Sequence, residues 1–448
     1  MRTRHGNRAL VTAFTVLLAS FGVWAVPPVR FAAPINSPIG TLDAIAIVAA
    51  DFNGDGILDI ADGAFNNRSL EILIGAGDGT FLPKTNYFVL GYSSRITVAD
   101  FNNDKKPDLA FGGSAFLGTG NGEFVAVNIF TNADTRHGWI LGGGDFNGDG
   151  NADLVCVQPE SPIDPQAGDA LTVWAGDGNG GFSALTNSYK LGFASDNPFP
   201  GASGDFNADG RLDLAVYYGP PTAQNPFNVF LGGGDGSFLI VTNNLLNAMG
   251  GALAVGDFNG DAKADLAVVN DTANLHFLLG DGTGAFVIVT NYDRRLIGGA
   301  VAIGDINGDG KADVVMATEG SSVSVFAGNG DGTFSLAFDQ ESGLNFYTDA
   351  ELADVNGDGR LDIVLCSGGT VCVLLNQTLP TLEANLIGEQ IRLVWPAWNG
   401  FTLEFTTDFS TTNTWVAVTN SPVLINDQRI LTKSVATDGQ RYFRLRKP

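Results

Sequence analysis

The residues with the clearest chemistry in this sequence are the acidic and amide side chains of DFNGDGILD, from Asp51 to Asp59. They follow the pattern Asp-x-Asn-x-Asp-Gly-x-x-Asp, in which the first, third and fifth side chains converge and the glycine permits a sharp turn. Calcium prefers about six to eight oxygen ligands in flexible geometry, and a final Asp can bind with both of its oxygens. Without an ion, three carboxylates held this close would repel one another. The loop is therefore predicted to bind Ca²⁺.

The same pattern occurs seven times at a period of about fifty residues, which indicates a repeat architecture and not a single grafted site. Each copy is predicted to hold one Ca²⁺, up to seven in all. The predicted calcium ligands are Asp51, Asn53, Asp55, Asp59, Asp100, Asn102, Asp104, Asp108, Asp145, Asn147, Asp149, Asp153, Asp205, Asn207, Asp209, Asp213, Asp257, Asn259, Asp261, Asp265, Asp305, Asn307, Asp309, Asp313, Asp354, Asn356, Asp358 and Asp362.

Two copies depart from the pattern at the sixth position. Lys105 replaces the glycine in the loop that begins at Asp100, and Ala262 replaces it in the loop that begins at Asp257. A residue other than glycine is strained if it has to adopt a left-handed conformation there. Pro107 also stiffens the exit of the first of these loops. We expect these two loops to bind Ca²⁺ most weakly.

Two other families of calcium loop are excluded by their requirements. A helical EF-hand needs Glu at the twelfth position. The seven copies have other residues there, namely Asp62, Phe111, Cys156, Val216, Val268, Met316 and Leu365. A dockerin-like module needs a helix after the loop, where this sequence predicts a strand. Polar turns that bind no metal remain the structural alternative.

The segments around each loop predict strands. Each loop follows a short apolar run such as AIAIVAA and precedes another such as DLAVV, and these runs are too short and too β-branched for helices. About 24 residues into each of the first six repeats stands a second motif, such as GAGDGTF, whose Gly and Asp residues suit a tight hairpin. Four strands per repeat and seven repeats predict an all-β, seven-bladed β-propeller. A kelch array has a similar period, but its glycine and tryptophan pattern is not evident.

The seventh repeat lacks the second hairpin and therefore its fourth strand. Phe31 precedes Asp51 by the same 20 residues that separate Phe334, the phenylalanine of the sixth hairpin, from Asp354. The segment RFAAPINSPIG is thus in register to supply the missing strand. Pairing of the two chain ends would close the ring and remove an exposed sheet edge.

The ends of the chain differ from the repeats. Arg2, Arg4 and Arg8 precede an apolar run of 16 residues from Ala9 to Trp24, which is typical of a secretory signal and short of the about 20 residues of a membrane span. We therefore assign residues 1–25 to a signal peptide and residues 26–378 to the propeller. Residues 379–448 alternate apolar and polar residues over several short strands and are predicted to form a β-sandwich.

The formal net charge of −24 excludes nucleic acid and an anionic membrane surface as partners. Three Asp residues in each loop are a specific source of this acidity. We expect a monomer without membrane insertion, secreted to the exterior or the cell surface, with the periplasm as the alternative compartment.

Only three cysteines are present, Cys156, Cys366 and Cys372. In an exported chain, CSGGTVC could form a disulfide between Cys366 and Cys372 if a five-residue turn set them opposite each other. Two small buried strand residues are the alternative, and Cys156 is expected to be buried in either case.

The repeats DFNGDGILDI and LGGGDGSF resemble the FG-GAP or VCBS repeats of the N-terminal β-propeller of integrin alpha subunits, over about residues 30–378. The resemblance implies the calcium ligands given above, and it implies that only some blades need be occupied. The C-terminal segment resembles the immunoglobulin-like or fibronectin-type-III-like modules of exported bacterial proteins.

Calcium loops that join strands are expected to be structural, so a ligand site is sought at the opposite end, where the longest loops lie around the second to fourth repeats. Aromatic and arginine side chains are favoured at binding hot spots. The candidates are Arg136, His137, Trp139, Phe199, Tyr217 and Tyr218. Packing between blades is the alternative role for Trp139 and Tyr217.

The predicted function is a secreted, calcium-binding propeller that serves in adhesion or binding of an extracellular glycan or protein. A polysaccharide lyase on a similar propeller and a passive scaffold are the two alternatives. A lyase needs a positioned base, and His137 and His276 are the only histidines after the signal segment. No nucleophile elbow, zinc motif or phosphate loop appears, so no catalytic residue is assigned.

Overall fold

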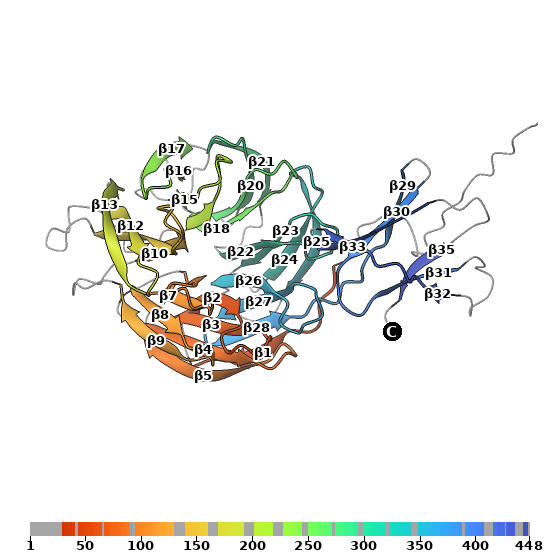
Figure 1. Ribbon diagram of the computed structural model, residues 1–448, viewed down its shortest axis with the longest axis horizontal. Coiled ribbons are helices and arrows are strands. Elements are labelled where there is room, and N and C mark those ends of the chain that lie inside the picture. The colour runs from red at the N-terminus through yellow and green to blue at the C-terminus, as the bar shows by residue number, and fades with distance from the viewer. Residues whose placement is uncertain are drawn as a thin grey trace, which may run out of the picture. The chain divides into compact units, whose positions relative to one another are not determined.

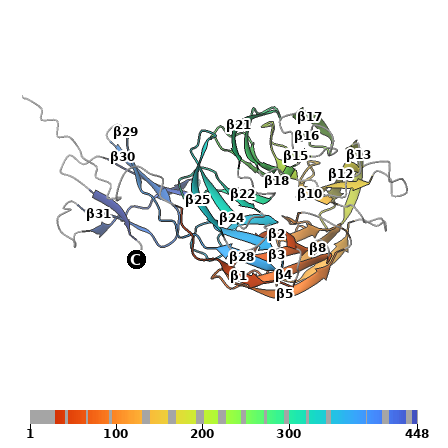
Figure 2. The same ribbon diagram turned by 180° about the vertical axis from the view of Figure 1, so that it is seen from behind.

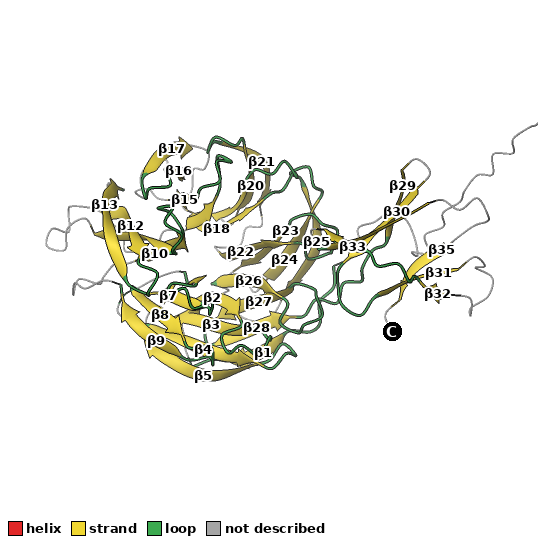
Figure 3. Ribbon diagram, viewed as in Figure 1, coloured by secondary structure: helices red, strands yellow, loops and turns green. Residues whose placement is uncertain are grey.

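The computed structural model describes most of the chain as two units. The repeat unit comprises residues 28–307 and 311–378, and the second unit comprises residues 379–448 with residues 1–27 and 308–310. Every described element is a β-strand (Figure 3), and none of the described segments is a helix long and apolar enough to cross a membrane. The described residues are 29–40, 44–64, 67–89, 91, 95–129, 139–159, 169–191, 201–217, 227–243, 250–270, 274–293, 299–318, 322–341, 348–387, 390–406, 415–425, 427–434 and 442–446.

The repeat unit consists of four-stranded antiparallel sheets (Figure 1), each with its strands hydrogen-bonded in sequence order except the last. The first three sheets are β2 (Ala44–Ala50), β3 (Asp59–Ala64), β4 (Ser69–Gly75), β5 (Phe81–Phe88); β6 (Thr97–Ala99), β7 (Asp108–Phe111), β8 (Ser114–Gly118), β9 (Phe124–Asn128); and β10 (Trp139–Gly144), β11 (Asp153–Pro159), β12 (Asp169–Gly176), β13 (Phe182–Lys190). The next three are β14 (Gly201–Gly204), β15 (Asp213–Tyr217), β16 (Phe227–Gly232), β17 (Phe238–Asn243); β18 (Gly250–Gly256), β19 (Asp265–Asn270), β20 (Asn274–Gly280), β21 (Phe286–Asp293); and β22 (Gly299–Gly304), β23 (Asp313–Thr318), β24 (Ser322–Gly328), β25 (Phe334–Glu341). The last is β26 (Asp349–Ala353), β27 (Asp362–Ser367), β28 (Thr370–Leu374) and β1 (Ile35–Pro38).

The second unit contains two sheets. Their strand orders are β29-β30-β34-β33 and β32-β31-β35. Leu393 and Trp395 from the first sheet share a buried cluster with Leu403 and Phe443 from the second, so the two sheets pack face to face. The strands are β29 (Glu383–Ile387), β30 (Gln390–Pro396), β31 (Thr402–Thr406), β32 (Val416–Ala417), β33 (Val423–Ile425), β34 (Gln428–Ser434) and β35 (Tyr442–Arg446).

Neighbouring sheets of the repeat unit share buried apolar clusters. Phe52 of the first repeat packs with Phe116 of the second, and Ile60 of the first repeat packs with Val364 of the seventh. Five further clusters join the intervening sheets in order. The first strands of successive sheets, such as β10, β14, β18 and β22, contact one another in the same order. Each apolar strand face is therefore covered by the next sheet, which explains why the strands read as short, nearly continuous apolar runs.

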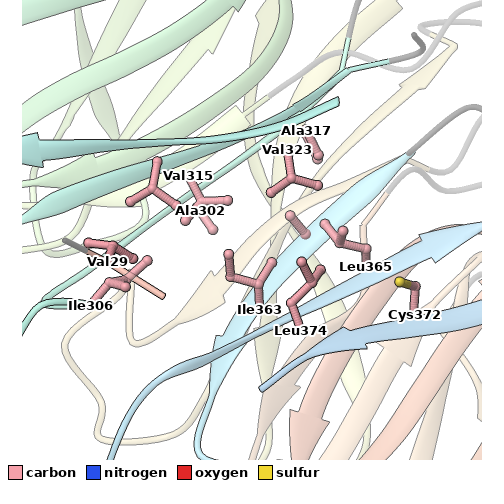
Figure 4. Close-up of a cluster of buried hydrophobic side chains, with 13 residues drawn as sticks. Val29, Ala302, Ile306, Val315, Ala317, Val323, Ile363, Leu365, Cys372 and Leu374 are labelled. Atoms are coloured by element: carbon pink, nitrogen blue, oxygen red, sulfur yellow. The ribbon is translucent and has the colours of Figure 1, made fainter. Parts of the chain in front are cut away.

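The N-terminal strand completes the last sheet, as predicted from the position of Phe31. Strand β1 pairs antiparallel with β28, with Ile35 opposite Val373, and Phe31 forms an isolated bridge with Asn376. Both views show β1 beside β28 (Figures 1 and 2). Val29 adds its side chain to the cluster between the sixth and seventh sheets (Figure 4). Residues from the two ends of the repeat region are thus held in one sheet.

Asn376 replaces the hairpin that the seventh repeat lacks. Its backbone N–H donates to Asp362 at 2.7 Å, a bond that a hairpin glycine makes in the other sheets. Its side-chain amide donates to the carbonyl of Ile306 at 2.8 Å and to that of Leu361 at 3.0 Å, and its Oδ1 accepts from the N–H of Thr378 at 2.9 Å. Asn376 is fully buried. One side chain therefore links the sixth and seventh repeats.

The structure shows no disulfide between Cys366 and Cys372, and both thiols are free and buried. The hairpin turn spans two glycines instead of five residues, so Cys366 lies opposite Val371 and Cys372 lies opposite Leu365. Successive positions of a strand point to opposite faces of the sheet. The two thiols accordingly belong to different clusters, one on each face. Cys156 is buried as predicted.

Replacing Asn376 with Ala is expected to lower the free energy of unfolding by about 3 kcal/mol, because two buried carbonyls and one buried amide lose their partner. Urea unfolding followed by tryptophan fluorescence measures this change. The matched control is Asn128→Ala on the exposed end of β9, which should change stability by less than about 0.5 kcal/mol. Equal effects of the two substitutions would contradict the linking role of Asn376.

Candidate functional site

In the six acidic loops that begin at Asp51, Asp100, Asp145, Asp205, Asp257 and Asp354, backbone N–H groups of the loop donate to its first, third and fifth side chains. In the first loop, Asp51 accepts from the N–H groups of Gly54 at 2.7 Å and Gly56 at 2.8 Å. Asn53 Oδ1 accepts from the N–H of Asp55 at 2.8 Å, and the Asn53 amide donates to Asp55 Oδ2 at 3.0 Å. These hydrogen bonds hold Asp51, Asn53 and Asp55, whose oxygens could bind a cation, close together.

The turn requires left-handed backbone at its fourth and sixth positions. Gly54 and Gly56 have φ angles of 78° and 85°. At the sixth position, Lys105 and Ala262 adopt 65° and 64°, which confirms the strain expected of the two departing loops. The fourth position shows the same demand in two other residues, which the sequence analysis missed. They are Asn103, at 59°, and Ala208, at 58°.

The ninth-position Asp has a different role from the other three polar positions. Asp59 is fully buried, and its two oxygens accept from the N–H of Phe52 at 3.0 Å and from the N–H of Gly75 at 2.9 Å. The Asp59 carboxylate therefore ties the acidic loop to the start of the Gly-rich hairpin in the same repeat. The same paired donors are Phe101 and Gly118 for Asp108, Phe146 and Gly176 for Asp153, Phe206 and Gly232 for Asp213, Phe258 and Gly280 for Asp265, Ile306 and Gly328 for Asp313, and Val355 and Asn376 for Asp362.

Burial restricts which residue can donate a hydrogen bond to Asp59 and raises the pKa of its carboxyl group. A Cβ atom on Gly75 would lie 2.2 Å from the carbonyl oxygen of Leu58, so only glycine brings its N–H this close to Asp59. Loss of hydration raises the pKa of Asp59, although its amide bonds and the nearby loop carboxylates also act on it. The same cause raises the pKa of Asp265 to about 6 and that of Asp362 to about 7.

The predicted calcium ligands of a loop differ in their exposure and in their hydrogen-bond partners. The described residues contain no group of three or more His, Cys, Asp or Glu side chains arranged to hold a metal ion. In the first loop, both oxygens of Asp59 accept from backbone amides, whereas Asp51 and Asn53 are partly exposed and Asp55 is exposed. Two carboxylates and an amide oxygen suit Ca²⁺ chemically, with water and backbone carbonyls completing the shell. The residues fit a calcium ion, and its binding stays a prediction.

The two motifs of the repeat also lock neighbouring sheets together. The carbonyl of Phe52, in the acidic loop of the first repeat, accepts from the N–H of Gly122, in the Gly-rich hairpin of the second repeat, at 2.8 Å. The Phe52 ring packs edge-on against Phe124 of that hairpin, with the centroids 5.5 Å apart. The corresponding backbone bonds run from Gly180 to Phe101, Gly236 to Phe146, Gly284 to Phe206 and Gly332 to Phe258. The acidic loops and hairpins therefore lie together at one end of the repeat unit.

The proposed aromatic ligand surface finds little support in its described residues. Trp139 is only 1% exposed and packs between the third and fourth sheets, so it takes the packing role and is not a surface residue. Tyr217 ends β15 opposite Phe227. The remaining candidates lie outside the described residues, namely Arg136, His137, Phe199 and Tyr218.

A charged group that the sequence analysis missed lies at the centre of the end opposite the loops. Arg95, before β6 of the second sheet, donates to the carbonyl of Gly201 in the fourth sheet at 2.8 Å. Asp349 and Glu351 of β26 in the seventh sheet lie within electrostatic range of Arg95. We call these three side chains the central mouth. They come from segments about 250 residues apart, so no local pattern could reveal them.

Burial dominates the electrostatics of the central mouth. It raises the pKa of Asp349 to about 6, against a hydrogen bond from the N–H of Ile47 at 3.0 Å. It raises the pKa of Glu351 to about 7, with the charge of Asp349 acting in the same direction and that of Arg95 opposing it. Arg95 itself is exposed, so the described part of the central mouth offers an accessible cation beside two acids whose pKa values are raised by burial.

Replacing Asp59 with Asn is expected to destabilise the protein by about 3 kcal/mol in chelator, because the new NH₂ group cannot accept from a backbone N–H. Asp55→Asn is the matched control, since Asp55 is exposed and its removal should cost less than about 0.5 kcal/mol without metal. Urea unfolding of both variants measures the difference. If Asp55→Asn proves the more damaging in chelator, the ninth-position role is wrong.

Comparison with known proteins agrees with this architecture. The structure is similar to BBS1N as crystallised in complex with ARL6DN and soaked with mercury, with a TM-score of 0.53, 12% identity, and coverage of 78% of this chain and 97% of that chain. The lead-soaked crystal of the same complex has a TM-score of 0.51, 13% identity, and coverage of 77% and 96%. At these identities the likeness concerns the fold alone. No curated protein matches the chain.

The family model for the FG-GAP-like repeat matches residues 51–111, 145–216, 205–268, 257–316 and 305–365, which together exceed half of the chain. Each matched span begins at the first Asp of an acidic loop and ends in the second strand of a later sheet. The FG-GAP part of the predicted resemblance is thus confirmed, whereas likeness to integrin alpha subunits in particular stays a prediction. The chain belongs to the FG-GAP-like repeat family, and its repeats form a β-propeller, an architecture that serves generally as a binding or scaffold module.

Proposed function

We propose that this chain is an exported, calcium-stabilised, seven-bladed propeller that binds an extracellular glycan or protein. The proposal rests on two features that lie at opposite ends of the repeat unit. The acidic loops stand at one end, where they pin the sheets, and the exposed Arg95 stands at the centre of the other end. The first end would supply stability and the second would supply recognition.

Seven blades in a closed ring are supported by the order of the sheets. Apolar clusters join each sheet to the next, including the seventh to the first, and Asp349 of the seventh accepts from Ile47 of the first. The β1–β28 pairing then acts as a clasp between the chain ends. A closed ring leaves no sheet without a neighbour on either face.

Calcium at the open side of the loops would neutralise carboxylates that lie close together. Asp51, Asn53 and Asp55 would hold it in the first loop. When bound, the ion supplies positive charge that offsets their repulsion, and a site made of exposed oxygens suits the weak affinities, about 10⁻⁴ to 10⁻³ M, of extracellular modules. Export, suggested by the residues before Val26, would place the protein where such calcium levels occur.

Recognition at the central mouth is supported by its position and its chemistry. First strands of the sheets begin there, so side chains from several blades can reach one ligand, as at the end of a propeller in general. BBS1N, similar in fold, was crystallised in complex with another protein, ARL6DN, which favours a protein among the ligand classes. The exposed Arg95 guanidinium suits a carboxylate of either a glycan or a protein.

Chelation should lower the melting temperature of the full-length protein by more than about 5 °C relative to 2 mM CaCl₂, because an ion that binds only the folded state stabilises it. Differential scanning calorimetry in EDTA and in calcium measures the shift. Magnesium serves as the control cation, since its preference for near-ideal octahedral geometry suits these flexible loops poorly. Superimposable melting curves with and without calcium would refute the calcium part of the proposal.

The Arg95→Ala variant should bind its ligand at least about tenfold more weakly than the wild type, because the mouth loses its exposed cation. A glycan array and an extracellular-matrix protein array identify the ligand, and surface plasmon resonance measures the affinity. Lys84→Ala on the outer strand β5 is the matched loss of charge and should leave binding unchanged. Unaltered binding by Arg95→Ala would exclude the mouth, and a rise in ultraviolet absorbance with acidic polysaccharides would favour the lyase alternative instead.

A further inference from the structure

The seventh position of the acidic loops varies in charge, and this variation has a structural consequence. Five loops carry a basic residue there and two do not. From the first loop to the seventh, the residues are Ile57, Lys106, Asn151, Arg211, Lys263, Lys311 and Arg360. The seventh residue lies directly beside the open side of the loop, because its backbone N–H donates to the fifth-position carboxylate in loop after loop.

Basic side chains at this position turn back onto the fifth-position Asp of their own loop. Lys106 Nζ lies 3.0 Å from Asp104 Oδ2. In two other loops, Lys263 Nζ lies 3.4 Å from the Asp261 carboxylate, and Arg211 Nη1 lies 3.7 Å from that of Asp209. The ammonium or guanidinium group therefore lies close to a carboxylate oxygen that a calcium ion would need. Such exposed pairs are weak in isolation, so calcium can displace them at some cost in affinity.

The seventh loop holds its cation most firmly. Arg360 donates from Nε to both oxygens of Asp358, at 3.1 and 3.0 Å, and from Nη2 to Oδ2. Its Nη1 donates to the carbonyl of Thr378 at 3.1 Å, and the side chain is only 9% exposed. Lysine side chains on the surface can swing away, whereas this guanidinium is fixed on both sides. A planar fork matched to a carboxylate is the strong form of an ion pair.

The first and third loops have no such competitor. Their seventh residues, Ile57 and Asn151, carry no charge, and both loops have glycine at the fourth and sixth positions. Asp55 Oδ2 and Asp149 Oδ2 accept from the neutral amides of Asn53 and Asn147 at 3.0 Å. These two loops thus combine the least strained backbone with the highest net negative charge.

We propose that the seventh-position residue sets the calcium affinity of each loop. The Asp51 and Asp145 loops bind calcium most tightly, the loops with an exposed basic residue bind it more weakly, and Arg360 takes the place of the ion in the Asp354 loop. This ranking places the Asp354 loop last, where the backbone strain at Lys105 and Ala262 alone would place the Asp100 and Asp257 loops. The inference rests on the proposed calcium binding and adds a ranking to it. The charge count of a calcium loop is a known determinant of its affinity.

The test is a calcium count on the full-length protein by equilibrium dialysis and elemental analysis over a range of free calcium. Two equivalents should bind in a tight class. Asp55→Asn and Asp149→Asn should each remove one of them, whereas Asp358→Asn should remove none. The readout is bound metal, so it does not depend on the ligand of the propeller.

Exchange of the seventh residue then tests the cause. Asn151→Lys, on a partly exposed side chain, should weaken one tight site by about fivefold, and Lys106→Ile should strengthen the Asp100 loop by a similar factor. Circular dichroism confirms folding, and Ile57→Lys repeats the first exchange in another loop. Calcium bound equally by all loops, or a tight equivalent lost in Asp358→Asn, would overturn the ranking alone. Absence of bound calcium in every variant would overturn the ranking and the proposed calcium function together.

Discussion

The rest of the propeller depends on one interaction, the buried carboxylate of the ninth loop position clamped between two backbone N–H groups. Asp59 and five of its counterparts join the acidic loop, which follows the first strand, to the hairpin that follows the third, and Asp362 joins its loop to Asn376. A buried charge is tolerated only when it is hydrogen-bonded, so sequence and backbone geometry are both constrained. Gly75 follows from the same constraint, since a side chain there would collide with the Leu58 carbonyl.

The clamp explains how the sheets are held to one another as well as internally. Once the loop is fixed, the carbonyl of Phe52 accepts from the N–H of Gly122 in the hairpin of the next repeat, and the Phe52 and Phe124 rings pack edge to face. The seventh repeat keeps the bond to its ninth-position Asp and the bond to the neighbouring loop, although it lacks the hairpin that makes them in the other repeats. With the hairpin absent, Asn376 makes both types of bond, one through its backbone N–H and one through its side-chain amide, and the N-terminal strand fills the remaining edge.

The two ends of the repeat unit differ in their charged side chains. At the loop end, carboxylates that take no part in the clamp remain on the surface, where calcium or a basic residue of the chain can balance them. At the other end, the first strands carry mostly small residues, and Arg95, Asp349 and Glu351 are the charged group described there. Residues at the central mouth can therefore vary without disturbing the clamp, in line with the general rule that one fold hosts many functions.

Local turn chemistry and a fixed register made several features predictable from the sequence, namely the repeat, the four strands of each sheet, the positions of the loops and the pairing of the chain ends. The sequence also indicated the strain at Lys105 and Ala262. Contacts between distant segments were needed to show that Asp59 faces amides, that Trp139 is buried, that Cys366 and Cys372 face opposite sides of a sheet, and that Arg95 reaches Gly201. These outcomes depend on which sheets pack together, because burial, and not residue type, assigns the role of each of these side chains.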